Sequence, residues 1–283
     1  MSESEKAAFI GLGSMGAPIA RRLARSGYSV VACDVLPAAL LAFDEPGTTR
    51  EPDPLNAARQ AKLLGICVRT DEQLERLVDG GVLFAAVGAG GLVILHSTVA
   101  PELARRLAAL AKTSGVDLID AGVSGGGPAA IEGKLSLFVG GEEAAVERAR
   151  PWLQAIGKSV AYLGPIGQGL EGKLLNNLIS IANYGMSAAI VDVGAKLGFD
   201  TAKLCEALMA GSAQSFALTI SPGWVKKSAL NTPARLLDLH DLLKKDVDHA
   251  RNLLPPGDPA MAALLASCEA MLARLKVAAA QAA

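Results

Sequence analysis

Six residues near the start of the chain, Gly11-Leu12-Gly13-Ser14-Met15-Gly16, have the types and spacing of a phosphate-binding turn. They follow a short apolar run (residues 7–10) and precede a segment with a helical pattern (17–26). In such a turn the first glycine allows the sharp bend, the second lets the backbone approach a pyrophosphate, and the third lets helix and strand pack closely. The helix N-terminus then holds the phosphate charge. The order predicts a dinucleotide site, and the alternative is a tight turn that binds no ligand.

An acidic residue, Asp34, follows a second apolar run (30–33), eighteen residues after Gly16. A carboxylate at this place can accept hydrogen bonds from both ribose hydroxyls and would repel a 2′-phosphate. Val35-Leu36-Pro37 comes next, so no arginine stands beside it to balance such a phosphate. The residues therefore predict NAD rather than NADP as the cofactor. The other interpretation of Asp34 is a solvated turn residue.

Ser124, Gly125 and Gly126 combine a hydroxyl with two residues whose bare backbone N–H groups can bind an anion. They follow an expected strand (117–121) and so belong to the C-terminal edge of the sheet, where open α/β sheets bind their ligands. We expect these three residues to bind a carboxylate. An ordinary glycine turn has the same composition and is the alternative.

Lys173 and Asn177 lie four residues apart at the start of a long helical segment, so they share one helix face. Apolar and small residues flank Lys173. Desolvation there would favour the neutral amine, which could exchange a proton with an alcohol oxygen. Asn177 could orient that lysine or the substrate. The alternative for Lys173 is a solvated helix lysine, and Lys244-Lys245-Asp246 likewise has the pattern of a solvated, salt-bridged face.

Short strand-like runs alternate with helical patterns in the first half of the chain, which predicts a mostly parallel sheet covered on both faces. The expected strands are 6–10, 29–34, 63–68, 92–96, 117–121 and 136–140. The expected helices between them are 17–25, 71–77 and 101–112. Residues 44–56 have the composition of a loop that could contain one helical turn.

The pattern becomes helical after residues 164–167. A segment without strand signal (168–197) would form a helix of roughly 45 Å. Further helices are expected at 201–210, 236–253 and 259–276, with a loop at 221–233 and a frayed end at 277–283. We therefore predict an α/β fold: a Rossmann-type, doubly wound NAD-binding domain (1–164) followed by an all-helical domain for substrate binding and oligomerisation (165–283). The small residues of the long helix favour a homodimer or homotetramer.

Composition excludes several classes of protein. The 283 residues suffice for two domains, and a net charge of −1 with 4% aromatic residues argues against nucleic-acid binding. No run of about 18 uncharged apolar residues occurs, so we expect no membrane span. The polar N-terminus (1–6) lacks the features of a secretory signal. Four isolated cysteines and three histidines have no metal-ligand spacing, so we expect no metal and a cytoplasmic location.

Taken together, the motifs resemble those of the β-hydroxyacid dehydrogenase family, which includes 3-hydroxyisobutyrate dehydrogenase and tartronate semialdehyde reductase. The glycine turn with Ala17-Pro18 is similar to the family's N-terminal signature. Residues 120–126, with 133–135 and 140–141, resemble its substrate-binding stretch. Residues 167–169 with Lys173 and Asn177 resemble its catalytic helix. Two further blocks match at 97–101 and 245–246, and the order agrees from about residue 7 to residue 250.

The resemblance implies a role for each of these residues. Lys173 would be the general acid/base in hydride transfer between a small β-hydroxy acid, such as 3-hydroxyisobutyrate, and the nicotinamide. Ser124 to Gly126 would bind the substrate carboxylate, and Asn177 would hold the substrate or the lysine. The remaining implied cofactor contacts are a nicotinamide-side pair and an adenosine-side run, namely Thr98 with Lys245, and Val68 with Arg69 and Thr70.

The chain departs from the family's pattern at four places. His96 stands where an acidic residue is frequent, Gly122 replaces a frequent proline, and Pro128 interrupts a stretch of small residues. Residues 215–239 match the family poorly, and the phenylalanine that usually lines the pocket has no matching position there. The substrate therefore stays open among 3-hydroxyisobutyrate, a β-hydroxy amino acid and tartronate semialdehyde, as does the direction of the reaction. An imine or semialdehyde reductase on the same scaffold is one alternative. A non-catalytic NAD-binding protein is the other. Lys173 argues against imine reduction, and Lys173 with the glycine turn argues against a non-catalytic protein.

Overall fold

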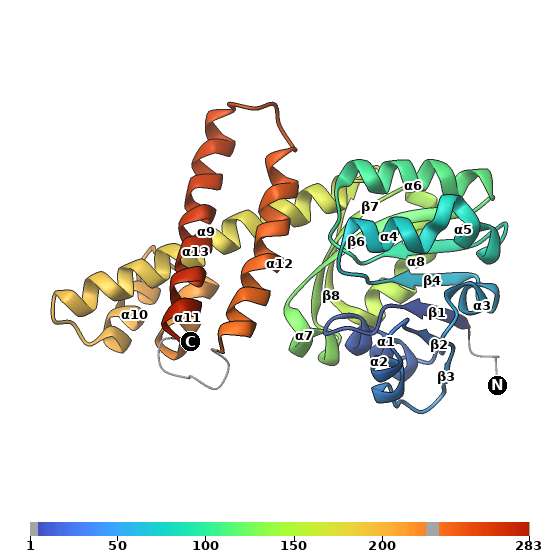
Figure 1. Cartoon of the computed structure of the whole chain (residues 1–283), viewed down its shortest axis with the longest axis horizontal. Helices are drawn as coiled ribbons and strands as arrows, with labels where there is room; N and C mark the ends of the chain where they lie inside the picture. Colours follow the sequence, from blue (N-terminus) through green and yellow to red (C-terminus); the bar gives the residue numbers. More distant parts are fainter. Residues whose placement is uncertain (1–4, 225–231, 283) are drawn as a thin grey trace. The chain divides into compact units, whose positions relative to one another are not determined.

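The computed structural model describes residues 5–224 and 232–282 of the chain. The chain divides into two compact units, Met1–Lys173 and Leu174–Ala283. The division falls within the long helix α9 (Gln168–Lys196), nine residues beyond the boundary expected at residue 164. Each unit is coloured along the sequence in Figure 1.

An eight-stranded sheet forms the centre of the first unit, in the order β3-β2-β1-β4-β5-β6-β7-β8. Its strands are β1 (Lys6–Ile10), β2 (Ser29–Cys33), β3 (Thr48–Arg50), β4 (Leu63–Ile66), β5 (Leu92–Leu95), β6 (Asp117–Ser124), β7 (Leu135–Gly140) and β8 (Gly157–Gly164). The strands from β3 to β6 in this order are parallel, whereas β7 is antiparallel to β6 and parallel to β8. The predicted doubly wound α/β fold is confirmed.

Helices cover both faces of the sheet (Figure 1). They are α1 (Gly16–Arg25), α2 (Pro37–Ala42), α3 (Pro54–Arg59), α4 (Asp71–Val78), α5 (Val82–Val87), α6 (Pro101–Thr113), α7 (Gly126–Glu132) and α8 (Glu143–Ile156). Two apolar cores result, because alternate side chains of a strand point to opposite faces. In β1, Ala7 and Phe9 join the core under α1, α7 and α8, while Ala8 and Ile10 join the core under α3 to α6.

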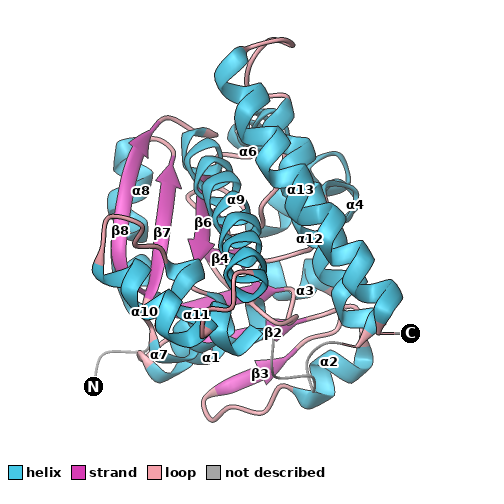
Figure 2. Ribbon diagram, turned by 90° about the vertical axis from the view of Figure 1, so that its left-hand side faces the viewer, coloured by secondary structure: helices cyan, strands magenta, loops and turns pink. Residues whose placement is uncertain are grey.

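The described part of the second unit consists of helices and their connections (Figure 2). After α9 come α10 (Thr201–Ala210), α11 (Phe216–Trp224), α12 (Pro233–Arg251) and α13 (Pro259–Gln281). The core shared by α9, α12 and α13 includes Leu178, Ile181, Val247 and Leu272, while α10 and α11 pack against α9 in a smaller cluster. The predicted helical C-terminal region is confirmed.

By length and composition alone, α9 could cross a membrane, although the sequence has no uninterrupted apolar run of the expected length. A core helix of a soluble protein has the same length and composition. Leu174, Leu178 and Ile181 of α9 are buried in the core of the second unit, so at least this face of the helix packs against protein.

Several elements differ from those expected. The predicted loop at 44–56 contains β3, which was not expected, and the start of α3, which agrees with the helical turn allowed there. β8 and α8 were not expected. β3 is only three residues long and β8 is a half-exposed edge strand, so neither shows a clear alternation of apolar residues. The expected loop at 221–233 contains the end of α11, and its residues 225–231 lie outside the described residues. Helix α13 extends through most of the segment expected to fray.

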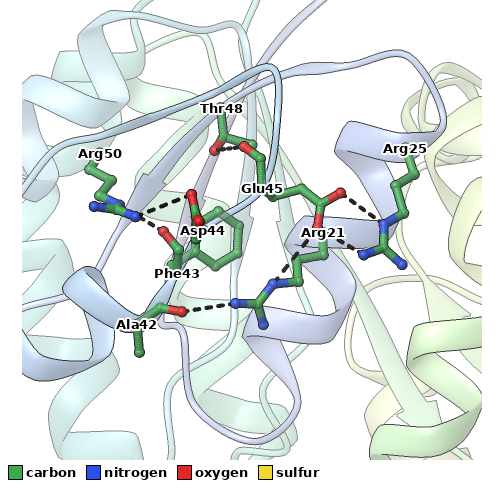
Figure 3. Close-up of polar contacts among 8 residues, drawn as sticks. All are labelled: Arg21, Arg25, Ala42, Phe43, Asp44, Glu45, Thr48 and Arg50. Carbon is green, nitrogen blue, oxygen red and sulfur yellow. Dashed lines mark hydrogen bonds and ion pairs between the residues drawn. The ribbon is translucent and has the colours of Figure 1, made fainter.

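Arginines tie the segment after β2 to α1 (Figure 3). Arg25 donates two hydrogen bonds to the Glu45 carboxylate, at 2.8 and 3.0 Å. The Arg21 guanidinium lies 4.9 Å from the centre of the Phe43 ring, and Arg50 donates a hydrogen bond to the Phe43 carbonyl at 2.7 Å. These contacts hold the connection between α2 and β3 against α1. Only α2 separates this connection from Asp34.

Candidate functional site

The candidate residues of the first unit gather at one edge of the sheet. Because β1, β2, β4, β5 and β6 are parallel neighbours, the residues that follow their C-terminal ends meet there. These residues are the glycine turn (11–16), Asp34, Val68 to Thr70, Thr98, and Ser124 at the end of β6 with Gly125 and Gly126 after it. The structure therefore brings together segments that lie far apart in the sequence.

The three glycines of the turn meet different constraints. Gly11 has φ of +96°, and a Cβ atom there would stand 2.2 Å from the Cys67 carbonyl oxygen. A Cβ atom at Gly16 would stand 1.8 Å from the Gly11 carbonyl oxygen. In contrast, no described atom lies within 4 Å of the place of a Cβ at Gly13. The first and third glycines are thus required by the fold, and the second leaves the backbone open to a ligand.

The start of α1 suits an anion. Among the described residues, no side chain caps this helix at Met15, and its first turn contains no acidic residue. The first N–H groups of a helix have no partner within the helix, and its dipole favours negative charge. With the open backbone at Gly13, this arrangement fits the pyrophosphate of NAD.

Asp34 is held against the same turn. Its Oδ2 accepts a hydrogen bond from the Leu12 N–H at 2.7 Å, and its Oδ1 accepts one from the Leu36 N–H at 2.8 Å. A carboxylate has about four acceptor positions, so acceptor capacity is left for ribose hydroxyls. The carboxylate is therefore fixed in orientation beside the phosphate-binding turn.

The loops after β4 and β5 are joined to each other. The Val68 N–H donates a hydrogen bond to the Ser97 hydroxyl at 2.8 Å, and the Ala100 N–H donates one to Asp71 at 3.1 Å. Thr70 caps α4 with its side chain. Val68 to Thr70 and Thr98 thus lie in neighbouring loops whose backbones are fixed.

The serine and glycines after β6 lie beside the glycine turn. Ser124 ends β6, and Gly125 and Gly126 follow with φ of +129° and +71°. A Cβ atom at the next residue, Gly127, would stand 3.5 Å from the Ser14 carbonyl oxygen. The predicted carboxylate-binding residues are therefore neighbours of the predicted phosphate-binding residues.

Lys173 is buried, with 7% of its surface exposed. Its aliphatic stem lies against β6, because a Cβ atom at Gly122 would stand 2.9 Å from the Lys173 Cβ and 3.0 Å from its Cγ. The glycine that replaces the family's frequent proline thus lets α9 approach β6 closely. A solvated surface lysine does not describe this environment.

Asp120, two residues before Gly122, is fully buried. Its carboxylate accepts hydrogen bonds from the Gly167 N–H at 2.7 Å and from the Leu170 N–H at 2.6 Å. Burial raises the pKa of Asp120 to about 7, and the N–H donors oppose this rise. Sequence reasoning assigned Asp120 no role of its own. The one available signal was an acidic residue within an apolar strand.

The His96 ring is buried among aromatic side chains and is hydrogen-bonded to the backbone of β6. Its ring stacks with those of Phe9 and Trp152, at centroid distances of 6.0 and 6.2 Å. Nε2 accepts a hydrogen bond from the Trp152 indole N–H at 3.1 Å, so Nδ1 carries the proton and donates to the Ala121 carbonyl at 3.0 Å. Burial lowers the pKa of His96 to about 4. The ring is therefore neutral at pH 7.

This pKa predicts a loss of stability in acid. In the unfolded chain His96 binds a proton near pH 6.5, whereas in the folded chain it does so only near pH 4. Between these values the unfolded state binds the proton first, so acidification from pH 7 to pH 4 removes up to about 3 kcal/mol of unfolding free energy. The measurement is denaturant unfolding at both pH values for the wild type and for His96→Gln. The variant should lose less stability on acidification, and equal losses would contradict the assignment.

The two candidate residues of the second unit are linked by Asp246. Asn177 donates a hydrogen bond to Asp246 Oδ2 at 2.7 Å, and its own Oδ1 accepts one from Asn176 at 3.1 Å. The Lys245 Nζ lies 3.2 Å from Asp246 Oδ1. Asp246 is buried, so it does not lie on the solvated, salt-bridged face that the sequence allowed, whereas Lys244 is exposed and pairs with Asp248. Asp246 is a further residue that sequence reasoning did not single out for the site.

Known proteins resemble both the sequence and the fold. A model of the NAD-binding domain of 6-phosphogluconate dehydrogenase matches residues 6–164. The chain is 36% identical over 220 residues to 3-hydroxyisobutyrate dehydrogenase of Pseudomonas aeruginosa, across 77% of this chain and 73% of that protein. It is 33% identical over 219 residues to the NAD-dependent L-serine dehydrogenase of the same organism, with the same coverage of 77% and 73%.

A solved structure agrees in fold. The 3-hydroxyisobutyrate dehydrogenase of Mycobacterium tuberculosis, solved with L-serine, has a TM-score of 0.79, 24% identity and 98% coverage of each chain. At this identity the likeness concerns the fold, and the sequence matches carry the relationship. The resemblance predicted from the motifs is confirmed. The chain belongs to the β-hydroxyacid dehydrogenase family of NAD-dependent oxidoreductases.

Proposed function

We propose that the protein transfers a hydride between a small β-hydroxy acid and NAD, with Lys173 as general acid/base. The observation that carries this proposal is the burial of Lys173 against Gly122, two residues before Ser124 on the same strand. The names of the two relatives in Pseudomonas aeruginosa support the substrate class. Both 3-hydroxyisobutyrate and L-serine carry a carboxylate and a hydroxyl on the β-carbon.

NAD would be held by the glycine turn, the N-terminus of α1 and Asp34. When bound, it supplies an acceptor for the hydride that leaves the hydroxyl-bearing carbon of the substrate. The negative charge of Asp34 disfavours the 2′-phosphate of NADP, so NAD is the expected cofactor. Val68 to Thr70 would border its adenosine side, and Thr98 and Lys245 would contact it near the nicotinamide.

The proton chemistry falls to Lys173. Its neutral amine accepts the proton of the substrate hydroxyl during oxidation, and its ammonium returns that proton during reduction. Ser124, Gly125 and Gly126 bind the carboxylate and so select an acid over a simple alcohol. Asn177 is the proposed substrate-binding residue of the second unit.

The direct test is absorbance at 340 nm with NAD, and separately with NADP, against 3-hydroxyisobutyrate, serine, threonine and other β-hydroxy acids. Tartronate semialdehyde is tested with the reduced cofactors. We expect strong turnover with NAD and at least one of these acids. A preference for NADP would contradict the role of Asp34 alone. Binding of NAD without turnover of any acid or semialdehyde would contradict the proposed activity.

The second unit carries an apolar surface that suits a second copy of the chain. Four apolar side chains of α9 are exposed by 45–54%, and Leu197, directly after the helix, is exposed by 71%. The five recur at the spacing of one helix face, namely Ile179, Met186, Ile190, Val193 and Leu197. Rows of exposed apolar residues of this length mark interaction sites. We propose that this α9 stripe forms a homo-oligomer interface, as the composition of the helix suggests.

Replacing Ile190 with aspartate should weaken this interface, because it buries a charge in an apolar contact. We expect sedimentation to give the mass of a single chain at concentrations where the wild type is an oligomer, a shift of about 100-fold in the dissociation constant. Leu41→Asp changes another exposed apolar residue outside the stripe and should leave the mass unchanged. A monomeric wild type would refute the proposal.

A further inference from the structure

The start of α9 is fixed to β6 by one buried carboxylate. Asp120 has no exposed surface, and its two oxygens accept hydrogen bonds from Gly167 and Leu170 at 2.7 and 2.6 Å. Gly167 directly precedes α9, and Leu170 lies in its first turn. Such N–H groups have no partner within a helix. A side chain from a strand thus caps a helix that begins 48 residues later in the sequence.

Two glycines leave room for this carboxylate. A Cβ atom at Gly169 of α9 would stand 2.4 Å from Asp120 Oδ2, and one at Gly140 of β7 would stand 2.7 Å from Oδ1. Both distances are shorter than real Cβ contacts, so any side chain at either position would displace the carboxylate or the helix. We call Asp120, Gly140, Gly167, Gly169 and Leu170 the Asp120 socket.

The Asp120 socket and the stem of Lys173 lie against the same face of β6. Asp120, Gly122 and Ser124 share one face of β6, since side chains alternate along a strand. On α9, Leu170 and Lys173 are three residues apart and lie on adjacent turns of one face. Asp120 binds the Leu170 N–H, and Gly122 receives the stem of Lys173. Fixing the first pair therefore fixes the second, next to the end of the strand that carries Ser124.

We propose that Asp120 is a positioning residue that holds Lys173 in place through the first turn of α9. This inference rests on the proposed role of Lys173 in proton transfer, and Asp120 itself has no exposed surface that could contact a substrate or cofactor. A displacement of about 1 Å in a catalytic group can lower a rate about 100-fold. An ion pair between Arg105 and Glu171 joins the same turn to α6. The start of α9 should therefore remain bound to the first unit when the socket is weakened.

The test is Asp120→Asn, which retains the shape but turns an amide NH₂ toward one of the two N–H donors. We expect kcat to fall about 10- to 100-fold while the Kd for NAD changes less than twofold. Hydrogen exchange of the peptide spanning 165–175 should become at least about tenfold faster, because one helix N–H loses its acceptor. Peptides from β1 and α1 should exchange as in the wild type.

Gly169→Ala is the second variant, since its methyl group would press on the socket from the helix side, and it should give the same pattern. Asp117→Asn is the matched control on β6. Asp117 pairs with Lys112 and Arg148 at the other end of the strand, and the change should leave kcat and exchange near 165–175 unaltered.

An unchanged kcat in Asp120→Asn would overturn the proposal. An equal loss of kcat and of NAD affinity would also overturn it, because it would indicate general damage to the fold. If the wild type itself turns over no β-hydroxy acid, the proposed function fails. Hydrogen exchange then still decides whether Asp120 holds the start of α9.

Discussion

Replacing Lys173 with alanine should lower kcat by about 10²–10⁴-fold, the usual contribution of a general acid/base, while the affinity for NAD stays nearly unchanged. The physical reason is that the substrate hydroxyl would lose its proton acceptor at the step in which the hydride leaves. The buried stem of Lys173 lies against Gly122, so the lost amine is not easily replaced by a neighbouring side chain. Steady-state kinetics and fluorescence titration with NADH measure the two quantities separately.

Two controls separate the loss of the amine from the loss of packing. Lys173→Met keeps an aliphatic chain over Gly122 and should be as inactive as Lys173→Ala, but more stable. Lys196→Ala changes an exposed lysine at the other end of the same helix and should be fully active. If Lys173→Met retains wild-type kcat, Lys173 is not the proton carrier.

Gly13→Ala should lower the affinity for NAD and Gly16→Ala should lower the stability of the fold, although both change a glycine of one turn. At Gly13 a Cβ atom would meet no described atom, so the folded protein should be as stable as the wild type. The methyl group would instead occupy the approach of the pyrophosphate, and we expect the Kd for NAD to rise at least about tenfold, or 1.4 kcal/mol. Thermal melting and NADH titration are the measurements.

Gly16→Ala should act on the fold. Its Cβ atom would stand 1.8 Å from the Gly11 carbonyl oxygen, which belongs to the backbone and cannot turn away. We expect a loss of about 3 kcal/mol or more in the free energy of unfolding, since overpacking of this kind costs about 1–3 kcal/mol even where side chains can adjust. Two variants of equal stability would contradict the division of roles between these glycines.

The residues that signal a function locally could be read from the sequence. The glycine turn, Asp34 and the strands between them are defined by neighbours a few residues away, so their pattern predicts both the sheet and the cofactor. The Asp120 socket could not be predicted in this way, because its parts come from β6, β7 and the start of α9. Likewise, His96 depends on Trp152, 56 residues further along the chain.

Burial was also hard to predict for the charged residues. The helical pattern around Lys173 is apolar on several sides, and it does not say which side faces the sheet. The close approach depends on a missing side chain at Gly122, which local propensity does not connect with a lysine on another element. Short or half-exposed strands such as β3 and β8 were missed because they lack the alternation that identifies a strand.

The glycine at position 122 has a consequence for exchanging parts between relatives. In this chain, the strand segment 120–126 and the helix start 167–173 fit each other as two matched surfaces. A proline at position 122 would add a Cβ atom 2.9 Å from the Lys173 Cβ, so a strand segment with proline there requires the start of α9 to lie farther from β6. A chimera that takes a proline-containing strand segment from a relative and the helix start from this chain would bring the proline against the Lys173 side chain. The two segments should therefore be exchanged together.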